Sequence, residues 1–129
     1  MDTKFIQGDG EDKPPTSVFG PEFLSTILYQ ESYLEDVELA CLLLRPRSIS
    51  VVEASLDKNA LTNENYGSVS PIYCITGKDK VTNADIQRWM VEKNPPNEAK
   101  TFQDSDHMIM TSCPEQLFTY LQDISKRYN

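Results

Sequence analysis

Asp79 and His107 are the two residues whose types and positions could support acid–base chemistry in this chain. Each comes shortly after a segment that is typical of a strand, and 28 residues separate them. A carboxylate beside a histidine can accept the Nδ1 proton of the imidazole, fix its tautomer and stabilise the imidazolium, as in a Ser-His-Asp triad. The alternative is that Asp79 only shapes a turn and that His107 is an ordinary loop histidine. Spacing alone leaves both interpretations open.

Two predicted strands decide whether these side chains meet. Residues 69–76 are a short apolar run rich in β-branched residues, which Gly77 ends, and residues 98–102 alternate as a second strand would. Two strands joined by a helix form a right-handed unit in which the strands are parallel, so their carboxyl ends lie side by side. We therefore expect Asp79 and His107 to lie on neighbouring loops.

A helix is predicted between these strands, and another ends the chain. Asn83 can cap the first helix and Pro95-Pro96 can end it, while its apolar residues recur at i, i+3 and i+4: Ile86, Trp89 and Met90. The last helix begins either with a capping box from Ser112 to Glu115 or with Pro114 in its first turn. Its apolar face is expected to pack on the sheet through Leu117, Leu121, Ile124 and Tyr128.

Two further helices are predicted in the N-terminal half. The first opens at Gly20-Pro21-Glu22, with an apolar stripe of Phe23, Leu24, Ile27 and Leu28. The second opens with a capping-box pattern from Ser32 to Glu35 and ends before Pro46. Apolar residues surround so much of the second helix that we expect extensive burial: Val37, Leu39, Ala40, Cys41, Leu42, Leu43 and Leu44. These helices could form a lid over a substrate pocket, although periodicity alone favours plain core packing.

The remaining segments carry weaker patterns. Residues 1–17 are predicted to be an exposed loop in which Phe5-Ile6 could form one strand of a hairpin without an evident partner. Residues 48–65 are weakly patterned. Ile49, Val51 and Val52 could form a short strand or a helical turn, and residues 57–65 are typical of a solvated connector.

Eight segments of the chain, taken in order, resemble one plant family. This family is the α/β-hydrolase group of methylesterases (salicylate-binding esterase, polyneuridine aldehyde esterase) and hydroxynitrile lyases. The segments are EFLSTILYQ (22–30), EDVELA (35–40), LRP (44–46), YGSV (66–69), DK (79–80), QRW (87–89), DHM (106–108) and KRYN (126–129). In α/β-hydrolases the triad acid precedes the histidine along the chain, which is the order found here.

The resemblance implies a fold, two regions and two site residues. The fold class is α/β, namely the C-terminal part of an α/β-hydrolase: a helical cap plus the last two parallel strands and their helices. Residues 1–65 would be the cap (lid) region and residues 66–129 the C-terminal part of the core. Asp79 matches the triad acid and His107 the triad base. Met108 occupies the position where the lyases have lysine, so the esterase branch fits better.

The catalytic serine is the member of the triad for which the sequence offers no candidate. A nucleophile elbow of the G-x-S-x-G type needs two glycines four positions apart. The five glycines do not provide this spacing: Gly8, Gly10, Gly20, Gly67 and Gly77. By the resemblance, the family's serine and oxyanion hole lie in its N-terminal half, so we expect an inactive, truncated relative. The alternative is an incomplete sequence of an active methylesterase that hydrolyses methyl esters of salicylate, jasmonate or indole-acetate.

Composition narrows the expected partners and compartment. The chain has 129 residues, 39% of them hydrophobic and 25% charged, which predicts one domain at most, and its formal net charge is −8. An acidic surface repels phosphate groups, so we expect neither a nucleic acid nor a membrane as partner. No signal, transit or membrane-spanning segment is evident, and the three cysteines lack paired spacing. These features predict a cytoplasmic protein with reduced thiols.

Other site chemistries fit the sequence poorly. A metal site would need His107 with Cys74, Cys113 or Asp106, but no CxxC or HxxxH spacing exists. Cys74 lies within a predicted strand rather than on an exposed elbow, so it is a poor nucleophile. No phosphate-binding loop is present either. We therefore expect no metal and no cofactor, and a small-molecule methyl ester or its free acid as ligand.

The predicted strand at residues 69–76 has an open edge. Val69, Ile72, Cys74 and Ile75 offer no charge that would discourage pairing, although Pro71 removes one donor. A two-stranded sheet is marginally stable. We therefore expect self-association, exposed apolar surface, or pairing with a full-length relative.

Overall fold

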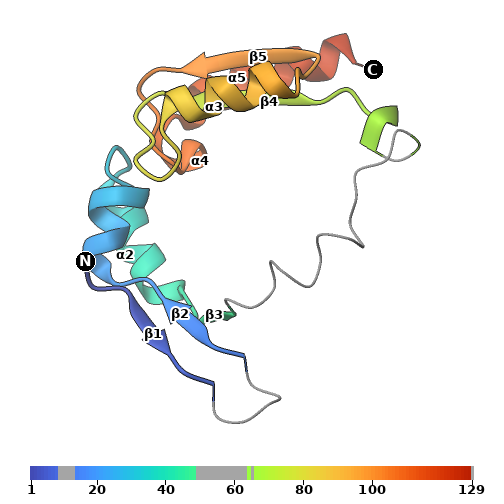
Figure 1. Ribbon diagram of the computed structural model, residues 1–129. Coiled ribbons are helices and arrows are strands. Elements are labelled where there is room, and N and C mark those ends of the chain that lie inside the picture. Colours follow the sequence, from blue (N-terminus) through green and yellow to red (C-terminus); the bar gives the residue numbers. More distant parts are fainter. Residues whose placement is uncertain (9–13, 49–63, 65, 129) are drawn as a thin grey trace.

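The computed structural model describes residues 1–8, 14–48, 64 and 66–128 (Figure 1). The secondary-structure elements within these ranges are β1 (Lys4–Ile6), β2 (Thr16–Val18), α1 (Pro21–Phe23), the π-helical segment η1 (Leu24–Leu28), α2 (Leu34–Leu43), β3 (Arg47–Ser48), the 3₁₀ turn η2 (Tyr66–Ser68), β4 (Ile72–Thr76), α3 (Ala84–Lys93), β5 (Glu98–Phe102), α4 (Ile109–Ser112) and α5 (Pro114–Arg127). The elements up to β3 form one group, and those from β4 onward form a second group (Figure 1). None of the helices in the described ranges is long and apolar enough to cross a membrane.

A small antiparallel sheet, in the order β1-β2-β3, lies in the N-terminal group. The strand predicted at Phe5-Ile6 is confirmed as β1, and its partner is β2, which pairs Lys4 with Val18. The prediction that residues 16–17 are loop was wrong, because a strand of three residues is too short to show an alternating pattern. The expectations for residues 49–63 lie outside the described residues.

The first predicted helix begins as expected, with Pro21 in its first turn. The carboxylate of Asp2 accepts the backbone N–H groups of Glu22 and Phe23, at 2.8 and 3.0 Å, and so supplies the cap from outside the helix. The chain then continues in the π-helical segment η1, where Leu24 and Leu28 are buried. This apolar pair anchors the N-terminal group.

Two predictions for α2 were wrong. Tyr33, not Ser32, is its N-cap, and no side chain caps the helix, because the Ser32 hydroxyl contacts Asp106 and Thr111 instead. Burial is also limited to Val37, whereas all four of its leucines are more than half exposed: Leu34 (68%), Leu39 (53%), Leu42 (74%) and Leu43 (62%). The helix packs on η1, and apolar residues distributed around a helix cannot all face one neighbour.

The second group contains the predicted strand–helix–strand unit. Strands β4 and β5 pair in parallel, from Ile72 opposite Glu98 to Thr76 opposite Phe102. The second strand has the predicted bounds, but the first begins at Ile72 rather than at residue 69, because residues 66–68 form a 3₁₀ turn. Asn83 caps α3 as predicted, with its side chain accepting the N–H of Ile86 at 3.0 Å.

The core of this group lies between the sheet and α5. Phe102, Cys113 and Tyr120 are buried together, and partly buried apolar side chains pack around them, including two of those predicted for the last helix: Ile72, Cys74, Ile109, Leu117 and Ile124. The Phe102 and Tyr120 rings meet edge to face, with centroids 5.8 Å apart. The two other residues of the predicted face are largely exposed, Leu121 at 52% and Tyr128 at 46%.

Helix α5 begins with Pro114 in its first turn, while the alternative capping box at Ser112 does not form. The short α4 before it was not predicted. Helix α3 contacts β4, and Trp89 and Met90 line a cavity of about 410 Å³ with Tyr73. Since Tyr73 alternates with the Ile72 and Cys74 side chains that face α5, the two helices lie on opposite faces of the sheet.

Candidate active site

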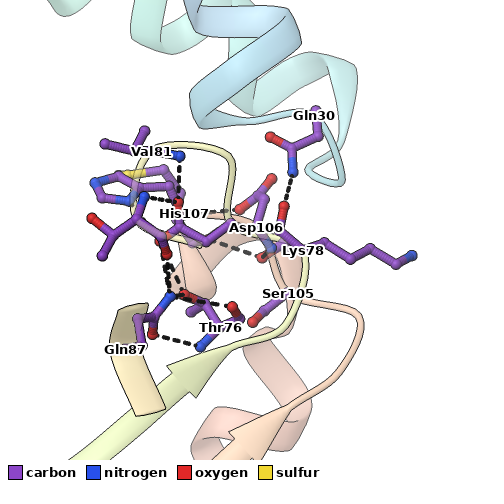
Figure 2. A network of polar contacts seen from close by, with 12 residues as sticks. Gln30, Thr76, Lys78, Val81, Gln87, Ser105, Asp106 and His107 are labelled. Carbon is purple, nitrogen blue, oxygen red and sulfur yellow. Dashed lines mark hydrogen bonds and ion pairs between the residues drawn. The ribbon is translucent and has the colours of Figure 1, made fainter. Parts of the chain in front are cut away.

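Asp79 and His107 face each other across the carboxyl ends of the two parallel strands. Asp79 lies in the loop that follows β4. His107, which Figure 2 labels, lies in the loop that follows β5. The His107 Nδ1 atom is 2.9 Å from Oδ2 of Asp79. The Asp79 side chain is 4% exposed, whereas the histidine is 36% exposed, so the pair is fixed on its acidic side and open on its basic side.

The Asp79 carboxylate is surrounded by hydrogen-bond donors. Oδ1 accepts the N–H groups of Val81 and Thr82, at 2.7 and 3.0 Å, and Oδ2 accepts the Thr76 hydroxyl at 3.1 Å. Burial acts to raise the pKa of Asp79, but the N–H of Thr82, the His107 imidazole and the N–H of Val81 outweigh it, so the pKa lies below its ordinary value. An ionised carboxylate can only accept, so Nδ1 of His107 carries the proton and Nε2 remains as the basic atom.

Asp106, directly before the histidine, was not predicted to have a structural role. It is fully buried, and its Oδ1 accepts the N–H of Met108 at 2.8 Å. Its Oδ2 accepts the N–H of Glu31 at 2.9 Å and the hydroxyl of Ser32 at 3.1 Å. The residues on both sides of His107 are therefore fixed, and the histidine loop is tied to the segment between η1 and α2.

The same segment also contacts the loop that carries Asp79. The Gln30 side-chain amide donates to the carbonyl of Lys78 at 2.6 Å, and the Lys78 ammonium pairs with Glu31 at 2.9 Å. Lys80 donates to the carbonyl of Thr26 at 2.9 Å. Residues 26–32 thus contact both loops of the candidate site. Figure 2 shows one of these contacts, from Gln30 to Lys78.

The side chains considered for other chemistries lie in unsuitable places. Burial raises the pKa of the Cys74 and Cys113 thiols, which disfavours the thiolate that acts as a nucleophile or a metal ligand. Cys74 lies inside β4, facing the core under α5. Asp106 directs both oxygens at neighbouring N–H and O–H groups rather than at His107.

Comparison with known proteins identifies the fold and the family. No protein-family model matches the chain. Among solved structures, tomato methylketone synthase I complexed with 2-tridecanone is 35% identical with a TM-score of 0.89, and this chain covers 50% of it. Polyneuridine aldehyde esterase is 33% identical with a TM-score of 0.85, and 49% of that chain is covered. The protein therefore has the fold of the C-terminal part of an α/β-hydrolase.

Curated relatives agree with this assignment. Methyl jasmonate esterase 1 of Vitis vinifera is 42% identical over 129 residues, which are 99% of this chain and 49% of the relative. The chain thus spans about half the length of the curated relatives it matches. It is a homologue of the plant methylesterases and of polyneuridine aldehyde esterase, as the resemblance predicted, and corresponds to their C-terminal half.

Proposed function

We propose that residues 1–129 provide the acid–base half of a plant methylesterase site, and that this chain by itself does not hydrolyse esters. Asp79 is the proposed acid and His107 the proposed base. The single observation that carries the proposal is the 2.9 Å contact between Nδ1 of His107 and Oδ2 of Asp79, with the histidine otherwise open. The triad member for which the chain offers no candidate is the nucleophile, because the sequence has no G-x-S-x-G elbow.

Each residue has a defined role in this proposal. Nε2 of His107 would take the proton from a serine hydroxyl as it attacks an ester carbonyl, and would return it to the leaving methanol. Asp79 would hold the Nδ1 proton and stabilise the imidazolium. Removing the nucleophile and the oxyanion hole takes away most of the transition-state stabilisation, so this half alone leaves little rate enhancement.

We further propose that residues 1–65 act as a cap and residues 66–129 as the core part that carries the acid–base pair. The contacts of residues 26–32 with both site loops support this division. Residues of the cap would cover an acyl pocket above His107. Three free cysteines, two of them at least partly buried, suit a reducing compartment, for which we propose the cytoplasm.

The substrate class we propose is a methyl ester of a small plant acid: jasmonate, salicylate or indole-acetate. The name of the grape relative supports jasmonate for that protein. Structures of the tomato relative contain 2-tridecanone and, in a variant, β-ketoheptanoate. The assay panel should therefore include a β-keto acid as well as the three esters.

The first test uses the chain as it stands. Purified residues 1–129 should hydrolyse the three methyl esters no faster than a His107→Ala control. A reproducible rate difference between the two proteins would contradict the statement that this chain alone is inactive.

The second test adds the N-terminal half of a relative. A chimera joins the N-terminal half of the grape methyl jasmonate esterase to residues 1–129, and its rate of methyl-ester hydrolysis is compared with that of the isolated chain. Hydrolysis by the chimera, abolished by His107→Ala, is the outcome expected if this chain can act within a complete methylesterase. A folded but inactive chimera would leave an inactive homologue as the better description.

A further inference from the structure

Gln87 is the buried residue of α3, although it is polar. It is 3% exposed, whereas its apolar neighbours Ile86 and Trp89 are 47% and 56% exposed. Contact between a helix and a strand needs only apolar side chains at such a position. A buried amide must instead find partners for its oxygen and its nitrogen, or it destabilises the fold.

The Gln87 amide is fully used, and its orientation is fixed. Its Oε1 accepts the backbone N–H of Thr76 at 3.0 Å, and its Nε2 donates to the carbonyl of Thr82 at 2.6 Å and to the hydroxyl of Thr76 at 2.8 Å (Figure 2). A backbone N–H can only donate and a carbonyl can only accept. The oxygen and nitrogen of the amide therefore cannot be exchanged.

This orientation determines the direction of the next hydrogen bond. Because Nε2 donates to Oγ1 of Thr76, that hydroxyl directs its own proton to Oδ2 of Asp79, 3.1 Å away. Nε2 itself lies 3.3 Å from the same Oδ2. The turn at Val81 and Thr82 holds only Oδ1, so Gln87 and Thr76 fix the other oxygen and with it the plane of the carboxylate.

We propose that Gln87, acting largely through the Thr76 hydroxyl, is a positioning residue that aims Oδ2 of Asp79 at Nδ1 of His107. The inference rests on the proposed roles of Asp79 and His107 as acid and base. Neither Gln87 nor Thr76 contacts a substrate in this assignment. Both act on the orientation of the carboxylate and therefore on the proton at Nδ1.

His107 is the single histidine of the chain, so its imidazole can be observed without assignment ambiguity. In residues 1–129 labelled with ¹⁵N-histidine, the wild type is expected to show an Nδ1 proton protected from exchange with water. The Gln87→Met and Thr76→Val variants should lose or broaden that resonance. Thr76→Ser keeps the hydroxyl and should retain it. Thr101→Val, on the neighbouring strand, is the matched control and should leave the signal unchanged.

The chimera provides a kinetic readout. Loss of a hydrogen bond to an ionised carboxylate is expected to lower kcat about tenfold in Thr76→Val and in Gln87→Met, with KM unchanged. Thr76→Ser should restore kcat, which a loss of packing alone would not explain. If Gln87→Met fails to fold by circular dichroism, the Thr76→Val and Thr76→Ser pair decides.

A protected Nδ1 proton in Thr76→Val and in Gln87→Met would overturn the inference, as would a wild type without that proton. An inactive wild-type chimera would count against the proposed function only, because the resonance in residues 1–129 still decides the role of Gln87.

Discussion

The hydroxyl of Ser32 lies 3.1 Å from Oδ2 of Asp106, the residue directly before the candidate base. The two residues are 74 positions apart in the sequence, and no sequence pattern predicts that they pair. Together with the N–H of Glu31, the serine fixes the buried carboxylate that shapes the histidine loop. Packing of the segment between η1 and α2 and the position of His107 are therefore linked.

A double-mutant cycle should detect this link. Asp106→Asn puts an amide N–H₂ group, a donor, where Oδ2 accepts from the Glu31 N–H and the Ser32 hydroxyl. It is expected to lower the free energy of unfolding by about 1–3 kcal/mol, and Ser32→Ala is expected to lower it by about 1 kcal/mol. The two losses should not add, because they remove the same contact. Urea unfolding measures both, and Ser25→Ala, whose exposed hydroxyl contacts its own helix, is the control. Fully additive losses would argue against the link.

Acid should destabilise the protein through Asp79. Its pKa is lowered in the folded state from an ordinary value of 3.8, so the unfolded state binds more protons as the pH falls. Stability from this group is complete above that ordinary value and is lost as the pH falls through the folded pKa. Unfolding midpoints between pH 2 and 6 should fall less steeply in Asp79→Asn than in the wild type. Equal slopes would mean that Asp79 contributes no pH dependence.

The hydrogen bond from Tyr120 to Glu98 should stabilise the fold. Tyr120 is 4% exposed, and its hydroxyl donates to Glu98 at 2.8 Å, next to the ion pair between Glu98 and Arg127. Burial, followed by the hydrogen bond to Glu98, raises the pKa of Tyr120 to about 12. Tyr120→Phe is expected to cost about 1–2 kcal/mol of unfolding free energy. Tyr33→Phe, at an exposed site, should cost almost nothing and serves as the comparison.

Exposed apolar side chains should make the isolated chain associate. Leu42 and Leu43 on α2 and Trp89 on α3 are all more than half exposed. Sedimentation at several concentrations should show association, and a dye that reports exposed apolar surface should bind the chain. Leu42→Gln and Trp89→Gln should reduce both the association and the dye binding. A compact monomer that binds no dye and unfolds cooperatively would contradict this expectation and would show that the chain is sufficient as a domain.

Much of the site geometry follows from local pattern. The strand at residues 98–102 and the Asn83 cap were predictable because alternation and capping act over a few residues. The parallel pairing was predictable because a helix joins the two strands. The meeting of Asp79 and His107 then follows from topology.

The missed features depend on distant partners. Ser32 fits a capping box locally, but Asp106 and Thr111 take its hydroxyl in the folded chain. Gln87 lies outside the predicted apolar stripe of α3, and its burial depends on hydrogen bonds to Thr76, 11 positions earlier in the chain. Strand β2 has too few residues to be recognised without its partners.

The most direct measurement of the central claim is methyl jasmonate hydrolysis by the chimera and its His107→Ala and Asp79→Asn variants. If the two residues are the base and the acid, kcat should fall by at least about a thousandfold in each variant, and the double variant should be no slower than His107→Ala alone. Variants that retain the rate of the parent chimera would contradict the assignment of Asp79 and His107 as its acid–base pair.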